Sequence, residues 1–114
     1  MVLIMVTSWF PHDKANDVGK KYVELAKKYP PTPELGETLA TAIKVSKEGI
    51  KSIGIAQVVK GKVEEFLAHN TKYMQEYAGI EGYCYEHEIL MDVTEALAVI
   101  GMKPPEEAEV PEIY

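Results

Sequence analysis

The sequence predicts a single α+β domain in which four strands and two main helices follow one another in the order βαββαβ. Apolar residues alternate or run together over four short segments, which is typical of strands. They recur at helical spacing over two longer segments that lie between the strands. The chain of 114 residues has the common size of one domain, and no Ser-, Gly- or Pro-rich linker divides it.

The first half of the predicted domain holds a strand, a helix and a hairpin. Residues 2–10 are rich in β-branched and large apolar side chains and end at a proline, which suits a buried strand. Apolar residues at helical spacing predict a helix over residues 14–29, and the prolines that follow end it. Alternation of side chains then predicts two strands, residues 38–46 and 50–60, joined by a short turn that ends in glycine.

The second half repeats a helix and a strand and adds a short helix. Residues 63–78 carry a single apolar stripe and predict the second main helix. Residues 83–91 alternate and predict the fourth strand. Asp92 and Glu95 have the spacing of a capping box, which predicts a short helix over residues 96–100.

The end of the chain differs in composition from the rest. We expect the folded domain to occupy residues 1–102. Residues 103–114 contain three prolines and four glutamates, which predicts an acidic, Pro-rich tail lying on the surface.

Charge and cysteine content exclude several classes of protein. The net charge is -6 and all twelve positive residues are lysines, so we expect no nucleic-acid partner, because such partners are bound by clustered Lys and Arg. Cys84 is the only cysteine, which allows no intrachain disulfide and favours a cytoplasmic protein. The apolar first ten residues are too short to span a membrane, so no membrane partner is expected either.

One face of the predicted sheet lacks a cover. A βαββαβ chain places both main helices on one face and leaves the other bare. If the larger apolar residues of the hairpin face the helices, the bare face of the hairpin carries small or apolar residues with one lysine, namely Ala40, Ala42, Lys44, Gly54, Ala56 and Val58. Strand 2–10 is apolar on both sides. Exposed apolar patches of this kind mark interfaces, so we expect a homodimer.

With this element order and bare apolar face, the sequence resembles the dimeric α+β barrel superfamily, whose ferredoxin-like subunits press their open sheet faces together. The resemblance covers residues 2 to about 91 and rests on element order and patterning, without the motif of a specific family. It implies a ferredoxin-like fold and a dimeric α+β barrel. An amino-acid-sensing regulatory domain, or a trimer stacked through strand edges, remains an alternative.

His87 and Asn70 are the candidate catalytic residues. His87 shares one face of its strand with two tyrosines, and an imidazole titrates near neutral pH, which suits acid–base chemistry. Asn70 lies in the middle of the apolar stripe of the second main helix, where a side-chain amide is costly unless it is hydrogen-bonded. For both residues, the interpretation favoured over catalysis is a packed core whose polar atoms are hydrogen-bonded.

Four further residues are candidates for ligand binding: Trp9, Tyr83, Tyr85 and His69. In the resembled superfamily, cofactor-independent monooxygenases and haem-degrading enzymes use Asn, Trp and His around the pocket. The resemblance thus implies that Trp9, Asn70 and either His69 or His87 surround a site. Glu86 and Glu88 alternate with His87 along the strand, so we expect no metal site there, and no cofactor is predicted.

Two functions follow from these residues. The first is a homodimer that binds a small apolar or aromatic ligand, with monooxygenase, isomerase or cyclase chemistry as candidate reactions. The alternative is a non-catalytic oligomerisation or regulatory module that binds another protein.

Overall fold

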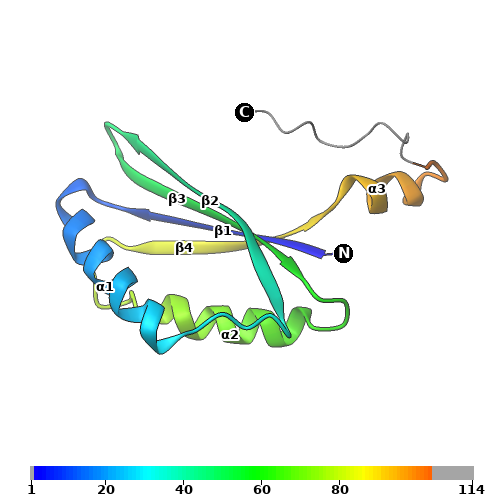
Figure 1. Cartoon of the computed structure of the whole chain (residues 1–114). Coiled ribbons are helices and arrows are strands. Elements are labelled where there is room, and N and C mark those ends of the chain that lie inside the picture. The colour runs from blue at the N-terminus through cyan, green and yellow to red at the C-terminus, as the bar shows by residue number, and fades with distance from the viewer. Residues whose placement is uncertain (1, 104–114) are drawn as a thin grey trace.

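The computed structural model describes residues 2–103 and shows a four-stranded antiparallel sheet with two long helices on one side (Figure 1). The strands lie in the order β2-β3-β1-β4. Along the chain the elements are β1 (Val2–Phe10), a 3-10 turn (His12–Lys14), α1 (Ala15–Lys28), β2 (Gly36–Ser46), β3 (Gly49–Val58), α2 (Val63–Gln75), β4 (Cys84–Met91) and α3 (Val93–Val99).

This architecture confirms the predicted α+β class and is compatible with a ferredoxin-like fold. The predicted short helix is placed wrongly, because α3 begins at Val93 and ends at Val99. The reason is the cap itself: the Asp92 carboxylate accepts a hydrogen bond of 2.7 Å from the Glu95 backbone N–H, so the helix starts directly after Asp92. The predicted tail, apart from its first residue, lies outside the described residues. Within residues 2–103, no helix is both long and apolar enough to cross a membrane.

The register of the sheet decides which side chains meet the helices. Val6 of β1 lies directly opposite His87 of β4 and Gly54 of β3, and paired residues share one side of an antiparallel sheet. His87 bonds to α2, so this is the helix-facing side. Ile4 of β1 and Val58 of β3 are on the same side and are fully buried. We call the opposite side the open side.

The prediction of which hairpin residues lie on the open side is confirmed for β2 and wrong for β3. Ala40, Ala42 and Lys44 of β2 do lie on the open side. The small residues of β3 predicted beside them, Gly54, Ala56 and Val58, instead face the helices, and Ile53 and Ile55 occupy the open side. The predicted strands leave three residues between them, whereas the turn has two, because Ser46 pairs with Gly49. This one-residue change in register places odd-numbered residues of β3 opposite Ala40, Ala42 and Lys44. A β-bulge between Thr38 and Ala40 alters the register only beyond these pairs.

A connected set of aromatic rings fills one end of the space between sheet and helices. Tyr83 stacks between Phe10 and Tyr77, with ring centroids 5.9 Å and 4.8 Å away. Tyr77 meets Tyr73 edge to face at 5.7 Å, and Tyr73 meets Tyr29 at 5.4 Å. These contacts join the end of β1, the start of β4 and both long helices through packed rings.

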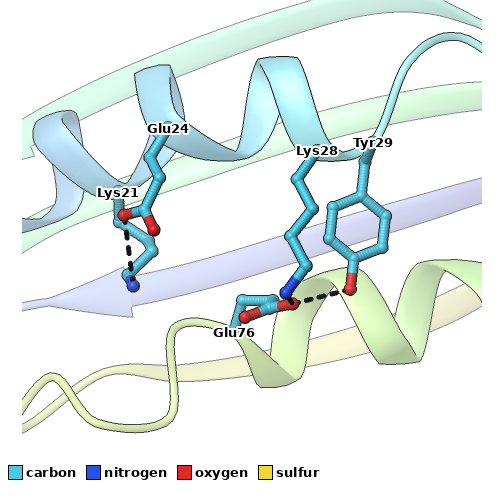
Figure 2. A network of polar contacts seen from close by, with 5 residues as sticks. All are labelled: Lys21, Glu24, Lys28, Tyr29 and Glu76. Atoms are coloured by element: carbon cyan, nitrogen blue, oxygen red, sulfur yellow. Dashed lines mark hydrogen bonds and ion pairs between the residues drawn. The ribbon is translucent and has the colours of Figure 1, made fainter.

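Polar contacts fasten the ends of α1 and α2 to each other (Figure 2). Glu76, which follows α2, accepts hydrogen bonds from Lys28 Nζ at 2.6 Å and from the Tyr29 hydroxyl at 2.7 Å. Lys21 and Glu24 form a looser pair within α1, at 3.4 Å. Only the first cluster joins two elements.

Two parts of the described chain cover little of the core. Most of β2 is exposed on both sides, including Leu39, Ile43 and Val45. The helix α3 lies beyond the end of the sheet, away from α1 and α2 (Figure 1), and none of its residues is buried. Uncovered apolar surface thus gathers at one sheet edge and in α3.

Candidate functional site

The structure brings the two candidate catalytic residues together. Asn70, in the middle of α2, and His87, in the middle of β4, are joined by a hydrogen bond of 2.7 Å between Asn70 Oδ1 and His87 Nε2. Both side chains are half-buried. The amide that is costly on the apolar stripe of α2 therefore finds its partner on the sheet.

This contact sets the chemistry of the imidazole. A carboxamide oxygen only accepts hydrogen bonds, so His87 Nε2 carries the proton and Nδ1 holds the lone pair when the ring is neutral. Burial lowers the pKa of His87 below its usual 6.5, because the charged ring is less well solvated between sheet and helix. The pair thus presents a neutral imidazole whose free nitrogen is a base.

Aromatic and small side chains surround the pair. Tyr85 meets the His87 ring edge to face at 5.6 Å, and its hydroxyl accepts a hydrogen bond of 2.9 Å from Gln75. On the sheet, Val6 and Gly54 continue the row that starts at His87. Val6 is part-exposed although its strand is central, and a Cβ placed on Gly54 meets no atom within 4 Å. The helices therefore leave room over this row.

Two of the predicted ligand-binding residues are engaged elsewhere. Tyr83 is stacked between Phe10 and Tyr77, and burial raises the pKa of its phenol. His69 packs against the Tyr29 ring at 5.9 Å. Both residues contribute to the packing between elements. Within residues 2–103, neither has a ring contact or hydrogen bond with His87.

Trp9 lies on the open side, across the sheet from His87, because it pairs with Cys84 of β4 and Lys51 of β3. It lines a pocket of about 390 Å³ at the end of the sheet, together with Pro11, Lys44, Lys51 and the hairpin turn. Neither Lys44 nor Lys51 is among the site residues predicted from the sequence. Their signal appears only in the register, since Lys44 lies directly opposite Lys51.

A second pocket, of about 470 Å³, is an open groove on the outer surface of α1, lined by Ala15, Asn16, Gly19, Lys20 and Val23. Neither pocket is lined by His87 or Asn70. Glu86 and Glu88 lie on the open side, away from His87. Over residues 2–103 no three His, Cys, Asp or Glu residues are grouped so that they could hold a metal ion.

Comparison with protein-family models, with curated proteins and with solved structures gives no match to this chain.

Proposed function

We propose that the protein is a homodimer of the dimeric α+β barrel type that binds a small apolar or aromatic ligand between α2 and the sheet, beside His87 and Asn70. His87 acts as the acid–base group and Asn70 holds its tautomer. Monooxygenase, isomerase and cyclase reactions are the candidate chemistries, since each can begin with removal of a proton from an aromatic or enolic substrate.

The hydrogen bond between Asn70 and His87 carries this proposal. It orients a neutral imidazole at a point where Val6 is part-exposed and Gly54 leaves open space. A ligand ring placed over Gly54 lies beside apolar surface, with the imidazole and the Tyr85 ring at its edge. Small-ligand sites have this composition of apolar walls and few polar groups.

The homodimer is proposed from the open side of the sheet. Its central rows hold Met5 opposite Ile55 and Thr7 opposite Ile53, with Ala40 and Ala42 continuing them onto β2. No element of the described chain packs over these rows, because α1 and α2 both lie on the other side (Figure 1). A second copy buries the same rows against themselves, as a two-fold interface requires.

A titration with 1-naphthol, followed by NMR of the histidine side chains, tests the ligand site. We expect the His87 signals to shift on binding, and His87→Gln to weaken the affinity by about tenfold, the effect of losing one good hydrogen bond. His12→Gln, at an exposed position in the 3-10 turn, is the matched control. The proposal fails if His87 does not respond, or if both variants bind equally.

A non-catalytic oligomerisation or regulatory module is the second candidate, and it is favoured by the fact that neither pocket reaches His87 or Asn70. In that case the pair only ties α2 to β4. Native mass spectrometry of the purified protein separates the two candidates: a dimer with no bound small molecule, together with a negative naphthol titration, favours the module.

A further inference from the structure

The pocket at the end of the sheet is built by the approach of two loops to the last residues of β1. Gly49, at the hairpin turn, has φ 145°, and a Cβ there would lie 2.9 Å from the Phe10 carbonyl oxygen. Gly82, before β4, has φ 83°, and a Cβ there would lie 2.7 Å from Pro11 Cγ. Side chains at these glycines would push the loops away. The pocket walls are therefore held close to β1.

Two lysines on adjacent strands line this pocket. Lys44 of β2 is directly opposite Lys51 of β3, both on the open side. Like charges in directly opposed positions destabilise a strand pair. In a chain with a net charge of -6, this pairing concentrates positive charge at one point. An anion bound between the two ammonium groups would relieve the repulsion.

The pocket also offers aromatic surface. Lys51 Nζ lies 6.0 Å from the centroid of the Trp9 ring, and Trp9 and Pro11 both line the pocket. Glu48 lines it too, so two lysines and one glutamate leave a formal excess of one positive charge. The volume of about 390 Å³ lies within the range of small-ligand sites.

We propose that this pocket binds a small aromatic monocarboxylate. The ring packs against Trp9 and Pro11, and the carboxylate accepts hydrogen bonds from Lys44 and Lys51. The pocket of about 390 Å³ has room for a one-ring ligand, and one negative charge matches the excess charge. The site is on the opposite side of the sheet from His87 and is independent of the function proposed there.

Trp9 is the only tryptophan of the chain, so its fluorescence reports on this pocket alone. Titration of the full chain compares benzoate with benzamide, which keeps the ring without the charge, and with acetate, which keeps the charge without the ring. Benzoate is expected to bind saturably and about tenfold more tightly than either analogue. Calorimetry on the same samples detects binding that leaves Trp9 emission unchanged.

Variants test the role of each lysine. Lys51→Met and Lys44→Met are each expected to weaken benzoate binding by about tenfold, the effect of one charge-assisted hydrogen bond. Lys47→Met, in the same hairpin turn but outside the pocket lining, removes the same charge and should bind as the unmodified chain does. Circular dichroism verifies the fold of each variant.

Three results would overturn the proposal. They are the absence of benzoate binding at millimolar concentration by both methods, equal affinity for benzoate and either analogue, and equal weakening by Lys47→Met and Lys51→Met. His87→Gln should leave benzoate binding unchanged, so failure of the His87 site and failure of this pocket are distinguishable.

Discussion

Asn70 and His87 form a hydrogen bond of 2.7 Å that joins the middle of α2 to the middle of β4. The contact has two consequences. It satisfies an amide that otherwise lies on an apolar stripe, and it holds an imidazole where burial disfavours its charged form. Stability and any acid–base chemistry therefore depend on the same pair.

The stability of the protein should fall as the pH drops below the usual pKa of histidine. The folded pKa of His87 is lowered from 6.5, so the unfolded chain takes up the proton first as the pH falls. This loss continues until the folded imidazole also titrates. We expect the change in urea midpoint between about pH 7.5 and pH 5.5 to be smaller in His87→Gln than in the unmodified chain. An equal change in both proteins would contradict the prediction.

Glu76 should matter more to stability than Glu24, although both are paired with lysine (Figure 2). Hydrogen bonds from Lys28 and then Tyr29 lower the pKa of Glu76 below its usual 4.5. Its contribution is therefore present above that value and is lost as the pH falls through the folded pKa.

Thermal melts of Glu76→Gln and Glu24→Gln test this difference. We expect Glu76→Gln to lower the melting temperature more at neutral pH, because Glu76, unlike Glu24, joins the end of α1 to the end of α2. The difference between the variants should vanish in acid. A larger effect of Glu24→Gln would show that the pair within α1 is the more important one.

Tyr83, a predicted ligand-binding residue, has a packing role in the structure. Its face on strand 83–91 suggests a ligand contact, but its ring is stacked between Phe10 and Tyr77 and its hydroxyl bonds to Ser8. We expect Tyr83→Ala to destabilise the protein by about 3 kcal/mol, the cost of removing a packed ring. Tyr83→Phe keeps the stack and should cost about 1 kcal/mol for the lost hydrogen bond. Urea unfolding of both variants measures the two effects, and similar losses would contradict the stacking role.

The sequence predicts elements well here because their signals are local. Alternation, helical spacing and prolines define β1 and α1 to within one residue at each end. Local patterns do not predict which side of the sheet each residue of β3 faces. Which residues of β3 share a side with those of β2 depends on the pairing register, which the length of the turn sets and which is not visible in one strand alone. The prediction that Gly54 lies on the open side is wrong for this reason.

For the candidate site too, the sequence indicates single residues but not their contacts. Asn70 and His87 could be selected one by one, because a polar group on an apolar face needs a partner. Their bond depends on how α2 crosses β4, which no local pattern contains. Trp9 was grouped with them, yet the alternation of β1 turns it to the other side. The opposed lysines, Lys44 and Lys51, become neighbours only through the hairpin register.

Dimer formation should depend on the open side of β2 and not on its other side. Ala42 lies on the open side opposite Ile53, whereas its neighbour Thr41 lies opposite Gly54 on the helix-facing side. Ala42→Glu buries an unpaired charge in the proposed interface and should shift the dimer to a monomer of 12.7 kDa in light scattering. Thr41→Glu adds the same charge to the same strand and should remain dimeric. A monomeric unmodified chain, or a trimer, would exclude the barrel.

The helix α3 should be stable only when two copies associate. It has 7 residues, far fewer than the roughly 12–15 that an isolated helix needs in water, and none of them is buried. The hydrogen bond from the Glu95 backbone to Asp92 specifies where the helix starts. An N-cap of this kind typically stabilises a helix by about 1 kcal/mol. Its exposed apolar residues, Val93 and Val99, therefore need a surface. The exposed apolar strand β2 of the same copy lies at the opposite edge of the sheet from β4, which precedes α3. We therefore expect a second copy to supply the apolar surface against which α3 packs.

Hydrogen exchange measured by mass spectrometry tests this dependence. We expect the amides of α3 to be protected in the unmodified chain and to exchange freely in Ala42→Glu, because removal of the second copy also removes the surface against which α3 packs. The amides of α1 serve as the internal control and should stay protected in both proteins, since Leu25 anchors that helix in the core of its own chain. Protection of α3 that survives in a monomeric variant would show that the helix is stabilised within its own chain. Free exchange in an intact dimer would show that α3 has no part in the association.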